Sequence, residues 1–199
     1  GNLHWGGTGK TPLVASIATH LRDAGRQVVV VSRGYGRRSR GVRVVSIGEG
    51  LIGNPLDAGD EPAMLASALR GVAIVVGADR YEAGCLAVDS LDPCPDIVLL
   101  DDGFSHAQLA RDLDLLVFPH HDAFAGGRLA PFGSLREPLA AAAAASAIIV
   151  AGIPEGPVGG GARVAAALAS FGFEGPGFGS AISAELDPPL PAGEPVLLV

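Results

Sequence analysis

Short apolar runs alternate with amphipathic stretches along most of the chain. Leu13, Ile17 and Leu21 recur at helical spacing, so we expect a helix over residues 9–24 that stops at Gly25. The same spacing predicts further helices over residues 60–69, 79–91 and 161–171. Compact runs rich in valine, isoleucine and leucine predict strands over residues 27–32, 42–47, 72–76, 96–100, 114–118, 147–150 and 196–199. An alanine-rich stretch from residue 139 is expected to be a buried helix that runs into the strand ending at residue 150. Continuous apolar strands separated by helices are typical of an α/β fold, with a mostly parallel sheet and helices on both faces.

Composition supports a large folded core. Apolar residues make up 48% of the 199 residues and charged residues 18%, less than the roughly 25% of ordinary soluble domains. The net charge of −7 argues against a nucleic-acid partner. Cys85 and Cys94 lack metal-ligand spacing and are too few for a disulfide scaffold, so we expect buried thiols.

The segment GGTGKT, residues 6–11, has the composition of a phosphate-binding loop. In such loops, backbone N–H groups wrap phosphates, a lysine contacts the outer phosphates, and the next hydroxyl ligates Mg²⁺. The residues expected to bind nucleotide are Gly6, Gly7, Thr8, Gly9, Lys10 and Thr11. His4 stands where the strict GxxxxGK[ST] pattern has its first glycine, and a purely structural turn is the alternative. Lys10 is the single lysine beside 13 arginines, which favours a role for a compact ammonium between phosphates.

The segment DIVLLDDG, residues 96–103, is an apolar strand that ends in two carboxylates and a glycine. Phosphate-binding loops work with a second Mg²⁺ anchor at the tip of a neighbouring strand. We therefore expect Asp101 and Asp102, together with Thr11, to hold the metal. The alternative is that the two aspartates only cap or turn the chain.

Six segments together carry a family resemblance. They are GNLHWGGTGKTPLV (1–14), SRGYGR (32–37), GDEP (59–62), ADRYEAG (78–84), DDGFSHAQLARDLDLLVF (101–118) and LREP (135–138). In this order they resemble the tetraacyldisaccharide 4′-kinases, the ATP-dependent lipid A kinases. The resemblance implies a P-loop NTPase-like fold. It also implies Mg²⁺-dependent transfer of the ATP γ-phosphate to the 4′-hydroxyl of a tetraacyl diglucosamine 1-phosphate. The expected place is the cytoplasmic face of a bacterial inner membrane, as a peripheral protein.

The resemblance also implies roles for individual residues. Asp60 would accept the proton of the sugar hydroxyl, with an N-cap of the following helix as the alternative. Lys10, Arg80 and Arg136 would stabilise phosphate charge. Glu137 would help hold Mg²⁺ or orient an arginine. Surface salt bridges are the alternative for Arg80, Arg136 and Glu137.

Two segments depart from the family pattern. Ser105 stands where the family has glutamine, and LAPFGSLRE replaces an LPxGPLRE-like segment.

The resemblance also bears on chain length. We expect the chain to be an internal piece that lacks the family's strand before residue 1 and a C-terminal lobe. Residues 1–173 would form the P-loop kinase core. Residues 174–199 would form a linker and the start of the second lobe.

Arginines are concentrated in one short segment. Arg33, Arg37, Arg38, Arg40 and Arg43 place five positive charges within 11 residues. We expect this segment to bind the lipid 1-phosphate or anionic headgroups, with a merely solvated basic loop as the alternative.

A different class of function also fits the loop. A P-loop switch ATPase would hydrolyse ATP to control a partner protein. Trp5 argues against it, because MinD-like switches have lysine at that place, and the sequence contains no NKxD motif for reading guanine.

Overall fold

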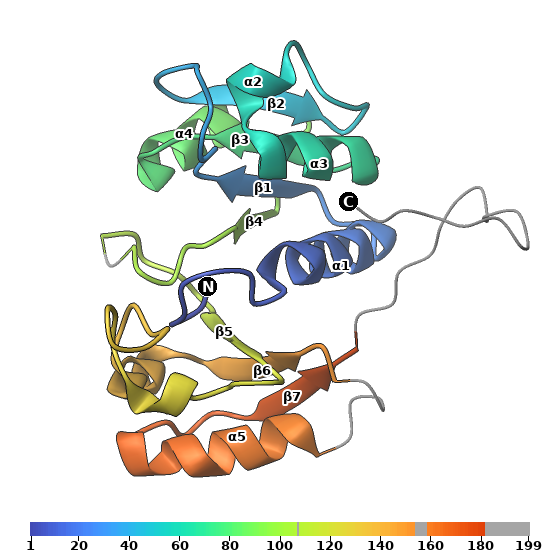
Figure 1. Cartoon of the computed structure of the whole chain (residues 1–199). Coiled ribbons are helices and arrows are strands. Elements are labelled where there is room, and N and C mark those ends of the chain that lie inside the picture. Colours follow the sequence, from blue (N-terminus) through green and yellow to red (C-terminus); the bar gives the residue numbers. More distant parts are fainter. Residues whose placement is uncertain (107, 154–158, 182–199) are drawn as a thin grey trace, which may run out of the picture.

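The first of two sheets contains four strands in the order β2-β3-β1-β4. In this computed structural model, which describes residues 1–106, 108–153 and 159–181, the strands are β1 (Val28–Ser32), β2 (Arg43–Ile47), β3 (Ala73–Val76) and β4 (Ile97–Leu100). Strand β1 pairs in parallel with β3 and β4, whereas β2 is antiparallel to β3. Figure 1 shows this sheet in the upper half of the molecule.

Helices cover both faces of the first sheet, as the continuous apolar strands predict. Val28 and Val30 pack in one cluster with residues of α1 (Lys10–Asp23) and α3 (Asp60–Ala68). Val29 and Val31 point to the opposite face and pack against α4 (Arg80–Ser90). A one-turn helix, α2 (Pro55–Ala58), precedes α3. The sequence analysis did not predict α2.

The second sheet contains β5 (Leu115–Pro119), β6 (Ala147–Ala151) and β7 (Gly177–Ser180), all parallel and in that order. Helix α5 (Gly160–Leu168) and the 3₁₀ turns η1 (Ala125–Gly127), η2 (Leu139–Ala144) and η3 (Ala169–Phe171) complete this half. Leu116, Phe118 and Ile148 are among the buried residues of its core.

An open slot separates the two sheets and lies between β4 and β5. Within the described residues, β4 pairs only with β1, and β5 pairs only with β6 in the named sheets. The Gly1 nitrogen donates to the Leu115 carbonyl at 2.9 Å, and the Val117 nitrogen donates to the Gly1 carbonyl at 2.8 Å. This is the bonding of a parallel ladder. Gly1 therefore occupies a strand position beside β5.

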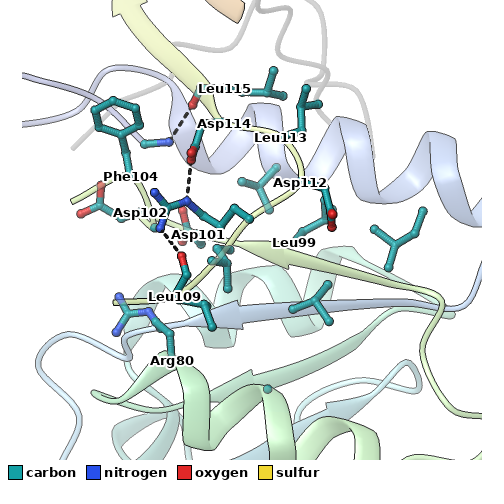
Figure 2. Close-up of a pocket in the computed structure, with 18 of the residues that line it drawn as sticks. Arg80, Leu99, Asp101, Asp102, Phe104, Leu109, Asp112, Leu113, Asp114 and Leu115 are labelled. Atoms are coloured by element: carbon teal, nitrogen blue, oxygen red, sulfur yellow. Dashed lines mark hydrogen bonds and ion pairs between the residues drawn. The ribbon is translucent and has the colours of Figure 1, made fainter. Parts of the chain in front are cut away.

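The slot continues as a cavity of about 930 Å³. Its walls include Leu13 and Ile17 of α1, Val98 of β4, and Val88 of α4. Figure 2 shows Leu99, Leu113 and Leu115 along it, with Asp101 and Asp102 near one end. Most of this cavity is thus an apolar gap between the two sheets, and only one end adjoins the carboxylates.

The expected α/β fold with mostly parallel strands is confirmed, and two details differ from the expectations. Among the described strands, β2 is the one that runs antiparallel to its neighbour, which a mostly parallel sheet allows. Residues 139–144 form a 3₁₀ helix, not an α-helix. Cys85 and Cys94 are exposed, not buried, and Cys85 borders the open slot. Strand β7, which the sequence analysis did not predict, extends the second sheet.

Two other expectations remain predictions. The strand expected over residues 196–199 lies outside the described residues. The division of the chain at residue 173 is likewise untested. As for membrane spans, a search of the described helices finds none with the length and apolar character needed to cross a bilayer.

Candidate active site

The glycine-rich loop of residues 6–9, predicted to bind phosphate, leads directly into α1. The helix begins at Lys10, and its N-cap is Gly9, which has a φ of 81° and provides no side-chain cap. The first turn of α1 also contains no acidic residue. The first N–H groups of the helix are therefore left without a side-chain acceptor, which is the arrangement that binds phosphate at helix N-termini.

Lys10, Asp102 and Arg136 meet at the end of the cavity. Lys10 Nζ lies 3.8 Å from Asp102 Oδ1. Arg136 holds the same carboxylate with two hydrogen bonds, Nη1 to Oδ2 at 3.1 Å and Nη2 to Oδ1 at 2.7 Å. This fork geometry fixes the carboxylate plane as well as its position. The structure thus brings together three residues that the sequence analysis assigned to the site.

A tight turn presents the two aspartates. The Asp101 nitrogen donates to the Val31 carbonyl at 2.9 Å and so continues the pairing of β4 with β1. Asp102 has a φ of 54°, a left-handed conformation that is costly for a residue with a side chain. At Gly103, a Cβ atom would lie 2.6 Å from the Leu100 side chain. Glycine is therefore required where the turn folds back.

The two aspartates have opposite electrostatic environments. Burial raises the pKa of Asp101, and the nearby charges of Glu61 and Asp102 raise it further. Burial by itself would also raise the pKa of Asp102, but the Arg136 hydrogen bond and the charge of Lys10 bring it below its ordinary value. Asp102 is thus a stabilised anion. Asp101 is a buried carboxyl whose raised pKa is only partly offset by the charges of Lys10 and the chain's amino group.

The residues at this end of the cavity suit Mg²⁺. Hard oxygen ligands from a hydroxyl and one or two carboxylates, with phosphate and water oxygens, are what this ion prefers. The Asp101 carboxyl is buried at this end and keeps a raised pKa despite the charge of Lys10, so a further cation there would offset the cost of its ionisation. A search of the described residues finds no group of three His, Cys, Asp or Glu side chains that could hold a metal unaided. A site completed by phosphate oxygens does not need such a group.

Arg80 is not a surface salt bridge. It is 4% exposed, lies on the wall of the cavity, and donates from Nη1 to the Gly77 and Ala78 carbonyls, each at 2.9 Å. Burial lowers the pKa of Arg80, and the neighbouring charge of Arg33 lowers it further. Figure 2 shows the Arg80 side chain below the two aspartates. A buried guanidinium that lies near another cation is in a position to bind an anion.

Glu137 contacts the residue that departs from the family pattern. The Ser105 hydroxyl donates to Glu137 Oε1. The segment containing Glu137 is tied to the loop by Arg136, whose backbone nitrogen donates to the Leu3 carbonyl at 2.8 Å. The Ser105 substitution therefore keeps a polar link between the DDGFSH and LREP segments. The role of Glu137 in binding metal or arginine remains a prediction.

Asp60 does not cap α3. The N-cap is Gly59, and Asp60 is the first helical residue, with an exposed side chain. The helix-cap interpretation of Asp60 is therefore wrong. The GDEP motif that contains Asp60 packs against the SRGYGR segment. A Cβ on Gly59 would lie 2.8 Å from the Tyr35 carbonyl, and one on Gly34 would lie 2.9 Å from the Ala58 carbonyl.

The arginine segment contains two kinds of arginine. Arg37 donates to the Ser39 hydroxyl and the Gly41 carbonyl, and Arg43 lies 3.9 Å from Asp57. These contacts hold the segment in shape. Arg33, Arg38 and Arg40 have exposed side chains.

Two residues of the site were missed by the sequence analysis. Glu61 acts on the pKa of Asp101 through its charge, and the two adjacent acids of GDEP were the available signal. Asn2 is fully buried and its side chain bonds to Thr8 within the loop. No pattern in the sequence marks that contact.

An uncapped helix after a glycine loop, with a lysine and strand-end carboxylates beside it, is typical of P-loop folds. The sequence profile described as "Tetraacyldisaccharide-1-P 4'-kinase" matches residues 1–169. The chain therefore belongs to the tetraacyldisaccharide 4′-kinase family, and the expected family and P-loop NTPase-like fold are confirmed.

Individual relatives agree with this assignment. A tetraacyldisaccharide 4′-kinase of Geobacter sulfurreducens is 45% identical over 150 residues, which is 75% of this chain and 42% of the relative. One of Syntrophobacter fumaroxidans is 49% identical over 151 residues, which is 75% of this chain and 39% of the relative. The chain thus spans about two fifths of the length of these relatives.

A solved structure shares the fold. It is the "apo" form of LpxK from Aquifex aeolicus in complex with ATP, with a TM-score of 0.69 and 42% sequence identity. The match covers 75% of this chain and 46% of that one.

Proposed function

We propose that this chain carries the ATP-binding core of a kinase that phosphorylates the 4′-hydroxyl of a tetraacyl diglucosamine 1-phosphate. The observation that carries the proposal is the contact of Lys10 with Asp102, which Arg136 holds from its other side. Family membership supplies the substrate class, and the related LpxK was solved with ATP.

The loop side of the site would bind ATP. Backbone N–H groups of Gly6, Gly7, Gly9 and the first turn of α1 would surround the phosphates. Lys10 would leave Asp102 and contact the outer phosphates. Thr11, Asp101 and Asp102 would hold Mg²⁺, which supplies positive charge against the phosphates. Arg80 and Arg136 add fixed cations, so charge that develops during transfer meets groups already in place.

The acceptor side would use the GDEP and arginine segments. Asp60 would take the proton of the attacking 4′-hydroxyl, which a solvent-facing carboxylate at a helix start can do. Arg33 would contribute a positive charge near Arg80. Arg38 and Arg40 would contact the lipid 1-phosphate or anionic headgroups at the cytoplasmic face of the inner membrane.

The test is phosphate transfer by the full-length protein. We expect the terminal phosphate of ATP to appear on a diglucosamine 1-phosphate acceptor, with little release to water when the acceptor is omitted. ATP hydrolysis at the same rate with and without acceptor would reject the proposal. That result would instead support a switch ATPase.

A further inference from the structure

The side chain of Asn2 links the two ends of the phosphate-binding loop. Asn2 is fully buried, and its Nδ2 donates to Thr8 Oγ1 at 2.9 Å. Thr8 is itself only 5% exposed. Between these two buried residues, Trp5, Gly6 and Gly7 are exposed. The hydrogen bond therefore joins the two ends of a protruding glycine-rich segment.

The main chain of Asn2 reaches the other side of the site. Its carbonyl accepts from Arg136 Nε at 3.2 Å and Nη2 at 3.0 Å. The same guanidinium holds Asp102, which contacts Lys10. Asn2 thus contacts both the loop and the arginine that fixes the strand-end carboxylate.

The polarity of this buried residue needs an explanation. Asn2 Oδ1 is buried and has no hydrogen-bond partner among the described residues. A buried polar atom without a partner is destabilising, and an apolar residue of similar size would avoid it. The Thr8 contact is what asparagine provides and an apolar residue does not.

We propose that Asn2 is a positioning residue. Its hydrogen bond to Thr8 holds the loop in the conformation that binds nucleotide. This inference rests on the proposed function, because it says what shapes the ATP-binding loop of that kinase. Glycine-rich segments are costly to order. A loop already closed at Thr8, two residues before Lys10, loses less freedom when phosphates bind, and its apparent affinity is higher.

The test uses the full-length protein and measures ATP binding directly by calorimetry, independently of lipid phosphorylation. Thr8→Val removes the hydroxyl at constant shape, and Asn2→Leu removes the amide but keeps the carbonyl that Arg136 uses. Each should raise the ATP dissociation constant by about 3- to 10-fold, the effect of one lost hydrogen bond. Thr8→Ser should recover most of the affinity lost in Thr8→Val. Thr19→Val, the same substitution within α1, is the matched control.

The double variant separates a shared bond from two independent effects. If Asn2 and Thr8 act through one bond, Asn2→Leu with Thr8→Val should bind ATP about as weakly as either single variant. Effects that multiply would overturn the proposal, and so would an unchanged ATP affinity in Thr8→Val with its melting temperature retained. A Thr8→Ser protein as weak as Thr8→Val would overturn it as well. A protein that shows the expected ATP affinities but transfers no phosphate to lipid would contradict the proposed function alone.

Discussion

Lys10 and Asp102 form an ion pair of 3.8 Å between the start of α1 and the turn after β4. The pair joins the glycine-rich loop to the strand-end carboxylates. Because Arg136 also holds Asp102, the carboxylate would keep its place if Lys10 moved to a phosphate, as proposed above. The proposed site is thus held together by the chain's own side chains.

Asp60→Asn should abolish transfer with little loss of ATP affinity. The substitution removes a proton acceptor and leaves the loop untouched, so kcat should fall by about 100-fold or more. Steady-state kinetics of the full-length protein with ATP and acceptor measure this. Glu49→Gln, at an exposed acid elsewhere, is the control. Near-normal turnover in Asp60→Asn would remove Asp60 from the chemistry.

Asp101→Asn should stabilise the protein at neutral pH while it impairs Mg²⁺-dependent transfer. The pKa of Asp101 is raised above 3.8, mainly by burial. The folded chain therefore binds this proton more tightly than the unfolded chain does. The stabilisation from that proton is complete below pH 3.8 and is lost as the pH rises through the raised pKa.

Thermal unfolding of the parent and the Asp101→Asn variant across pH measures this effect. The melting temperature of the variant should exceed that of the parent at pH 7, and the difference should disappear near pH 3. A variant that is less stable than its parent at pH 7 would contradict the assigned electrostatics.

Replacing Arg38 and Arg40 by serine should weaken binding to anionic vesicles. Each basic residue near such a surface contributes about 1 kcal/mol, so the loss is about 30-fold at low salt. Arg37 is left in place because it bonds within the segment. A matched variant, Arg26→Ser with Arg163→Ser, removes the same charge from other exposed positions. Equal binding by the two double variants would show that the arginine segment is only solvated.

A short β-branched extension before Gly1 should stabilise this chain. Gly1 already has the hydrogen bonds of a strand beside β5, and the slot toward β4 is lined by apolar side chains. Five residues rich in valine and isoleucine would cover this surface and pair with both edges, which should raise the melting temperature by several degrees. A glycine–serine extension of equal length is the control. Equal melting temperatures would show that the slot does not accept a strand.

Periodicity predicted most elements because their apolar faces are built into the sequence. Helix α1 and strand β1 begin and end within a residue or so of their expected limits. Strand β7 was not predicted because its sequence, GFGS, has little β-propensity and becomes a strand by pairing with β6.

The site residues also divide into those that the sequence predicts and those that depend on contacts made in the folded chain. Lys10 and the two aspartates follow from motifs with a known physical role, whereas Arg80, Arg136 and Asp60 came from family resemblance. The bond from Asn2 to Thr8 was not predicted, because a contact between two polar residues near a turn leaves no periodic trace. Long-range pairing, such as Arg136 with Asp102, is fixed only when the chain folds.

The most direct test of this account is to locate the phosphate transferred by the full-length protein and by its Lys10→Arg variant. Phosphorus NMR of the lipid product should show a new phosphomonoester on the 4′-oxygen in the parent. The variant should lose at least about 100-fold in rate, because a guanidinium fork cannot replace an ammonium between phosphates. Arg26→Lys, at an exposed position, serves as the control. Phosphate released only to water, or a Lys10→Arg protein of full activity, would contradict the account.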